Sequence, residues 1–185
     1  ICEGLVGSEM CIRDSGGPDH HKRLAARGKL PVRERVFHFL DPDSPFLEIS
    51  GLAAYKSEYP IGGGAFAGIG VSSGIECVIF ANDPTVLAGA MHFYSVKKWM
   101  RCMQIARDCR IPFIQFVESA GGDLRPRAGA AVGGMGHFAE SGRQFYEITE
   151  LSKLNIPTVT VAFGTATAGG AYQPGMSDYN IFVKN

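Results

Sequence analysis

The sequence predicts an α/β domain with a parallel sheet. Two similar units support this: an Ile-Pro pair opens each of the short, mostly apolar runs 113–117 and 158–163, and a glycine-rich turn follows each run. A helical segment, 135–154, separates the two units. Strand, glycine turn and helix in repetition are typical of parallel strands joined by helical crossovers. Short apolar strands also fit burial on both faces of a sheet.

The first half of the chain supplies a helix and further strands. We expect a short basic helix within 20–40, with Pro31 near its start, where proline is tolerated. A short strand is expected at 46–49. The runs 66–71 and 76–81 flank a turn of serine and glycine, so they predict a β-hairpin.

The second half begins with a helix at 91–109. Val96, Trp99 and Met103 fall on one face of it at helical spacing, a stripe that favours core packing over a cofactor site. A final strand is expected at 179–183.

Composition excludes several classes of protein. The 185 residues suffice for one domain with a core, and 45% are hydrophobic and 19% charged. Lys plus Arg and Asp plus Glu both number 18, which argues against nucleic-acid binding. No apolar run approaches the roughly 20 residues of a membrane helix. The cysteines form no CxxC pair and the histidines show no ligand spacing, so we expect no metal and a reduced, cytoplasmic compartment.

The first candidate motif, Glu-Ser-Ala-Gly-Gly at 118–122, follows the run 113–117 directly. Backbone N–H groups of glycine can approach a ligand closely, and two such donors stabilise negative charge forming on a carbonyl oxygen. A simple tight turn explains the same glycines. Ser119 is not the nucleophile of a G-x-S-x-G elbow, because Val117 stands where the first glycine belongs.

The second motif, Thr-Ala-Thr-Ala-Gly-Gly-Ala-Tyr at 165–172, follows the run 158–163. A helix beginning near Gly169 would direct free N–H groups and its dipole towards an oxyanion or phosphate. A small-residue helix packed on the sheet explains the pattern equally well. Both turns are expected at the carboxyl ends of parallel strands, where ligands bind. Chemistry carried by backbone donors instead of a side-chain triad favours an enolate formed from a thioester.

The two ends of the chain are unusual. Residues 1–15 resemble a translated sequencing adaptor and show no helical or strand period, so we expect them to be non-native. We place the domain at 16–185. The chain stops directly after the strand-like run 179–183, so we expect the domain to be truncated at its C-terminus.

Several stretches, collinear over 27–185, resemble one enzyme family. They are Lys29–Arg35, Gly68–Gly70, Gly74–Cys77, Ala81–Asp83, Thr85-Val86, Val96–Lys98, Ser119–Leu124 and Thr167–Asp178. They are similar to the carboxyltransferase (beta) subunits of biotin-dependent acyl-CoA carboxylases, and most similar to the methylcrotonyl-CoA carboxylase type. Departures at 87–90, at 92–95 and at Ala120 and Asp123 leave the acyl specificity open.

This resemblance implies a crotonase-like (ClpP/crotonase) fold, an incomplete spiral of ββα units that forms most of the first of two domains. It implies that Gly121 and Gly122 are catalytic, their N–H groups donating to the thioester oxygen. The implied substrate-binding residues are Ala168, Gly169, Gly170 and Ala171, which would shape the acyl-CoA pocket.

The resemblance also implies the reaction and the partners. A carboxyl group would move from carboxybiotin to an acyl-CoA, and the biotin ureido group would take the substrate proton, so no side-chain base is required. Biotin would be carried by a partner biotin carboxylase or biotin carrier subunit, and coenzyme A would enter as part of the substrate. The second domain would make a homo-oligomer, placed in the cytoplasm or, in a eukaryote, the mitochondrial matrix.

Two other functions fit the same motifs. A crotonase-type acyl-CoA hydratase or isomerase would use the same oxyanion hole with a carboxylate base, for which Glu118 and Glu140 are the local candidates. A non-catalytic acyl-CoA-binding subunit would keep the fold but would not need glycine pairs at both turns.

Overall fold

The computed structural model describes residues 15–125 and 138–184. Its strands form one sheet in the order β1-β2-β3-β4-β5-β6. The strands are β1 Leu47–Glu48, β2 Ala65–Ser72, β3 Ile75–Asn82, β4 Phe113–Ser119, β5 Thr158–Ala166 and β6 Tyr179–Phe182. The α-helices are α2 Pro18–Ala26, α3 Val32–Phe39, α4 Phe93–Cys109, α5 Phe138–Lys153 and α6 Tyr172–Gly175, and two 3-10 turns are η1 Leu87–Gly89 and η2 Ala168–Ala171.

The sheet is antiparallel at one side and parallel at the other. β1, β2 and β3 pair antiparallel, whereas β3, β4, β5 and β6 pair parallel. The predicted hairpin is therefore β2 and β3. Its turn places Ser73 and Gly74 at φ 52 and φ 75. The Asp41 carboxylate accepts hydrogen bonds of 2.7 Å from the N–H group of each, which fastens the turn to the residues that follow α3.

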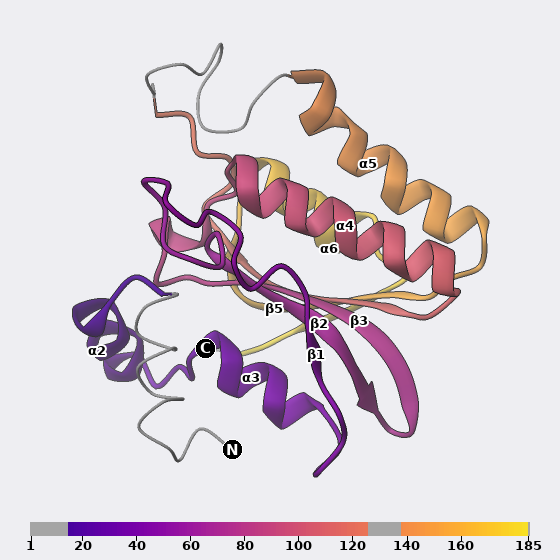
Figure 1. Ribbon diagram of the computed structural model, residues 1–185, viewed down its shortest axis with the longest axis horizontal. Coiled ribbons are helices and arrows are strands. Elements are labelled where there is room, and N and C mark those ends of the chain that lie inside the picture. The colour runs from indigo at the N-terminus through magenta and orange to yellow at the C-terminus, as the bar shows by residue number, and fades with distance from the viewer. Residues whose placement is uncertain (1–14, 126–137, 185) are drawn as a thin grey trace.

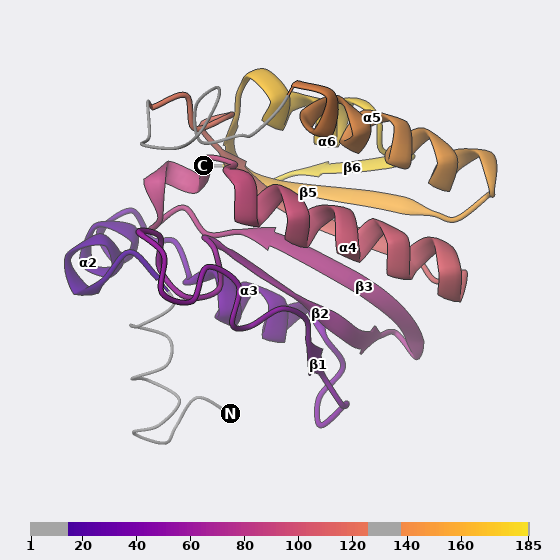
Figure 2. The same cartoon turned by 45° about the horizontal axis from the view of Figure 1, so that its top comes forward.

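Helices cover both faces of this sheet (Figures 1 and 2). On one face, Trp99 and Met103 of α4 and Ile148 and Leu151 of α5 pack on the sheet. Helix α3 covers the opposite face. All seven residues of β4 are buried, as predicted for a strand enclosed on two sides.

The basic segment forms two helices where one was predicted. Pro31 is the N-cap of α3, so the predicted helix and its proline are confirmed, but α2 precedes it. Leu24 is the one buried residue of α2. A helix with so little apolar surface has no periodic stripe to reveal it. Gly28, at φ 68, separates the two helices.

The prediction for residues 1–15 falls almost wholly outside the described residues. Ser15 alone is described; its hydroxyl lies 2.7 Å from Nε2 of His21. The non-native origin of this segment stays a prediction.

Candidate functional site

The two glycine motifs lie side by side. β4 and β5 are neighbouring parallel strands, and Ser119 pairs with Ala166 at their carboxyl ends. The N–H group of Thr167 then donates to the carbonyl oxygen of Ser119 at 3.1 Å. The turn after β4 and the turn after β5 therefore meet at one edge of the sheet, as the repeated pattern predicted.

Contact between these turns requires glycine at two positions. Gly121 has φ 94, and a Cβ atom there would lie 3.0 Å from the carbonyl oxygen of Thr167. A Cβ atom on Gly170 would lie 3.1 Å from Oγ of Ser119. These two glycines allow the close approach of the turns, so each has a structural role whatever its part in chemistry.

A third segment, 87–91, completes the edge. The N–H group of Ala120 donates to Ala88, and that of Met91 donates to Gly121 at 2.7 Å. A Cβ atom on Gly89 would lie 1.9 Å from the carbonyl oxygen of Glu118, so no side chain fits there. Sequence reasoning did not place this segment in the site; Gly89 was the one local signal that could have suggested it.

The N–H groups of the turns divide into bonded and free ones. The N–H group of Gly121 donates to Oγ of Ser119 at 3.1 Å, and that of Gly170 donates to Thr167 at 2.9 Å. Within the described part of the chain, no acceptor is found for the N–H groups of Gly122, Ala168 and Gly169. Each turn thus retains donors for a ligand, and Gly122 is the freer of the two predicted catalytic donors.

The segment near Gly169, where the sequence allowed a helix to begin, forms only short elements. The segment forms η2 and then α6, each four residues long. Ala168 has φ 47, an uncommon conformation for a residue with a Cβ atom. Such short elements carry little dipole, so the second turn offers individual N–H groups instead of a helix terminus.

The residue after the first glycine pair fixes the turn in place. The Asp123 carboxylate accepts hydrogen bonds from Nε of Arg125 at 2.8 Å and from the Tyr59 hydroxyl at 3.0 Å. These bonds, that of Arg125 above all, hold the pKa of Asp123 well below its usual range. The Tyr59 ring stacks on His92 with centroids 3.6 Å apart, which joins the loop before β2 to the site.

Glu118 is held by two cations. Nζ of Lys29 lies 2.6 Å from Oε1, and Nη1 of Arg35 lies 2.7 Å from Oε2. Both carboxylate oxygens therefore have a charged partner, and the carboxylate lies against α3. This geometry disfavours Glu118 as the catalytic base of a hydratase or isomerase. The Glu140 side chain lies outside the described side chains.

The described residues show two further features. They contain no group of three or more His, Cys, Asp or Glu side chains able to hold a metal ion. Among them, no helix has the length and apolar character needed to cross a membrane.

Comparisons with known proteins agree on one family. A family model described as "Carboxyl transferase domain" matches residues 23–185. The chain is 46% identical, over 91% of its length, to a protein named "Probable biotin-dependent acyl-coenzyme A carboxylase beta2 subunit" from Mycobacterium tuberculosis. It is 42% identical, over 94% of its length, to the "Probable methylcrotonoyl-CoA carboxylase beta chain, mitochondrial" of Drosophila melanogaster. It spans 31% and 30% of these two relatives.

Solved structures confirm the predicted fold. The beta subunit of geranyl-CoA carboxylase from P. aeruginosa superposes with a TM-score of 0.77 at 37% identity, covering 90% of this chain and 32% of that one. Transcarboxylase 12S superposes with a TM-score of 0.81 at 24% identity, covering 96% of this chain and 34% of that one. Carboxyltransferase structures of this kind have the crotonase-like fold.

Proposed function

Since the chain belongs to the carboxyl transferase domain family, we propose that it is part of an enzyme that moves CO2 from carboxybiotin to an acyl-CoA. The relatives named as acyl-CoA carboxylase beta subunits support this reaction. The observation that carries the proposal is the pair of adjoining glycine turns, each with free N–H donors at the carboxyl edge of the sheet.

We propose that these donors stabilise an enolate. The N–H group of Gly122 binds the thioester oxygen, with Gly121 shaping the turn behind it, and Ala168 and Gly169 offer donors from the second turn. Gly170 and Ala171 belong to the same acyl-CoA pocket. Preorganised donors act most strongly where charge develops in the transition state, which here is the thioester oxygen.

Proton transfer is consistent with a cofactor as the acceptor. The two described carboxylates beside the first turn, Glu118 and Asp123, are both committed to cationic partners. Carboxybiotin, when bound, would supply CO2, and the ureido nitrogen freed by its release would take the substrate proton. The described residues of this edge are therefore suited to holding and polarising the acyl-CoA, with proton transfer left to the cofactor.

The proposed reaction also implies the partner subunits and the cellular compartment of the enzyme. Biotin reaches the site on a biotin carboxylase or biotin carrier subunit, and a second domain completes a homo-oligomer. We place the enzyme in the cytoplasm, or in the mitochondrial matrix of a eukaryote. The methylcrotonyl-CoA type is the first acyl specificity to test, because the Drosophila relative bears that name.

Assay of the full-length protein with a biotin carboxylase partner tests the proposal. Carboxylation of methylcrotonyl-CoA that avidin abolishes is the expected result. Hydration or isomerisation of enoyl-CoA without biotin would establish the hydratase alternative. Tight acyl-CoA binding with neither reaction would establish the non-catalytic alternative.

A further inference from the structure

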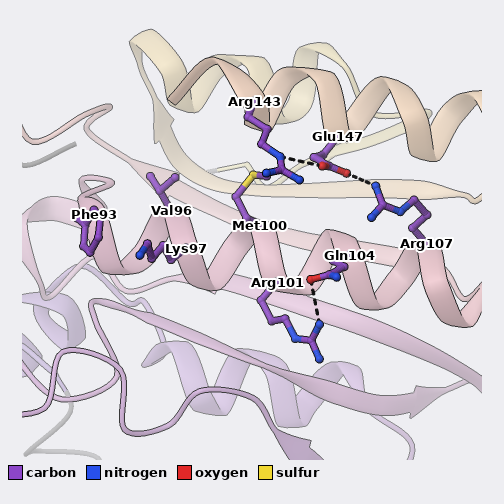
Figure 3. A pocket seen from close by; sticks show the side chains of 9 residues that line it. All are labelled: Phe93, Val96, Lys97, Met100, Arg101, Gln104, Arg107, Arg143 and Glu147. Carbon is purple, nitrogen blue, oxygen red and sulfur yellow. Dashed lines mark hydrogen bonds and ion pairs between the residues drawn. The ribbon is translucent and has the colours of Figure 1, made fainter. Parts of the chain in front are cut away.

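A groove between α4 and α5 carries a concentration of positive charge that the glycine turns do not explain. Its volume is about 340 Å³, and Lys97, Arg101, Arg107 and Arg143 line it with a single carboxylate, Glu147. The whole chain has a formal net charge of zero, so this excess is local. Figure 3 shows Arg143 and Glu147 of α5 opposite Met100 and Arg107 of α4, while the side chain of Arg101 extends from α4 on the side away from α5.

Glu147 fixes two of the guanidinium groups. Its side chain is only 4% exposed and accepts hydrogen bonds from Nη1 of Arg107 at 2.6 Å and from Nε of Arg143 at 3.2 Å. One negative charge thus orients two positive charges, one from each helix. Nε of Arg107 also lies 3.6 Å from Oδ1 of Asp108, so the donors that remain for an anion come mainly from Nη2 of Arg107 and the Nη atoms of Arg143.

The other end of the groove combines cations with apolar surface. Phe93, Val96 and Met100 of α4 line it. Nζ of Lys97 lies 4.3 Å from the centroid of the Phe93 ring, and Arg101 bonds Gln104 at 2.9 Å. Lys97 and Arg101 have no carboxylate partner among the described residues. A ligand with a flat apolar ring and several negative charges matches such a surface.

We propose that this groove binds a nucleotide, with its phosphates on the cations and its base on the apolar strip. Arginine and lysine are the side chains that most often bind phosphate, and the volume lies within the range of small-molecule sites. The nucleotide could be the end of a coenzyme A molecule or a free nucleotide such as ADP. Helix α4 begins directly after Met91-His92, and Met91 pairs with Gly122, so one end of the groove adjoins the glycine turns. The site does not depend on the proposed carboxyl transfer.

Calorimetry on the full-length protein at low ionic strength tests the site, with ADP, coenzyme A, adenosine and inorganic phosphate as probes. The Lys97→Gln/Arg101→Gln double variant removes two cations that do not pair with Glu147, so its fold should be retained. We expect the double variant to bind ADP and coenzyme A at least about tenfold more weakly, because a hydrogen bond to a charged group contributes about 1.5–3 kcal/mol. Arg23→Gln on the exposed surface of α2 is the matched control and should change affinity less than about twofold.

The probes distinguish the sources of the nucleotide. Coenzyme A that binds more tightly than ADP and competes with it identifies the end of the thioester substrate, whereas equal affinities identify a free nucleotide. Both outcomes support the site. In either case, added salt should lower the affinity of the ligand, because it screens the charges. The proposal would be overturned if neither ligand binds, or if the double variant binds them as tightly as the wild type. It would also be overturned if ADP binds no more tightly than phosphate or adenosine. None of these results requires carboxylase activity, so the groove and the proposed function fail separately.

Discussion

Glu118→Gln should destabilise this domain strongly. The carboxylate bridges Lys29 and Arg35, whose side chains are 18% and 4% exposed, and its own side chain is 10% exposed. Breaking a buried ion pair costs about 3–5 kcal/mol, and a glutamine oxygen can still accept one of the two bonds, so we expect about 2–4 kcal/mol. Since 1 kcal/mol shifts Tm by about 2–4 °C at this chain length, Tm should fall by about 4–16 °C.

Glu48→Gln is the matched control for this experiment. Glu48 pairs with Arg33 at 3.0 Å, but its side chain is 28% exposed, and a pair of this kind contributes at most about 1 kcal/mol. Thermal unfolding followed by circular dichroism compares the two variants. A Tm that falls by less than about 4 °C in Glu118→Gln, or by no more than it falls in Glu48→Gln, would refute the reasoning. If full-length Glu118→Gln also lost all turnover while keeping its Tm, Glu118 would be a catalytic base after all.

Three further predictions concern the site, the thiols and the sheet edge. In the full-length enzyme, Gly122→Val should lower kcat about 10²–10³-fold with a smaller change in acyl-CoA affinity, because the side chain obstructs an N–H donor to the transition state. A folded variant whose kcat is within about threefold of the wild-type value would show that Gly122 is a simple turn residue. Iodoacetamide at pH 8 should modify Cys109 but neither Cys77 nor Cys102, since burial raises their pKa values to about 11 and about 12; peptide mass spectrometry reads this out. The 185-residue chain should show no carboxylase activity alone, because it spans only 31% of a relative named as an acyl-CoA carboxylase beta subunit; turnover of carboxybiotin would contradict this. It should also self-associate, because the apolar side chains of β6 are exposed; a monomer in sedimentation at high concentration would contradict this.

Local patterns were sufficient for most elements of the fold. The hairpin prediction at 66–71 and 76–81 differs from β2 and β3 by one residue at each end, because serine and glycine mark its turn clearly. The predicted start of α4 at residue 91 was two residues early. His92 is the N-cap there: its N–H group donates to Oγ of Ser95 at 2.8 Å, a capping contact that apolar periodicity does not reveal.

Local sequence patterns could not predict the contacts that shape the site. Met91 meets the first glycine turn through a parallel bridge to Gly122, and Tyr59 reaches Asp123 from the loop before β2. Segments far apart in sequence make these contacts, and no spacing rule connects them. The sequence could place both glycine pairs at the edge of the sheet, but which N–H groups stay free depends on acceptors such as Oγ of Ser119.

Glu118 shows how one such contact decides between functions. Its position beside a glycine turn allows a catalytic base or a structural carboxylate, and the sequence alone supports both readings. The structure places Lys29 and Arg35 on its two oxygens. A catalytic base must have an oxygen free to reach the substrate proton, whereas both oxygens of this carboxylate are bonded to cations. The described carboxylates of this edge therefore hold structural positions, which agrees with the proposal that backbone donors stabilise the enolate and that a cofactor takes the substrate proton.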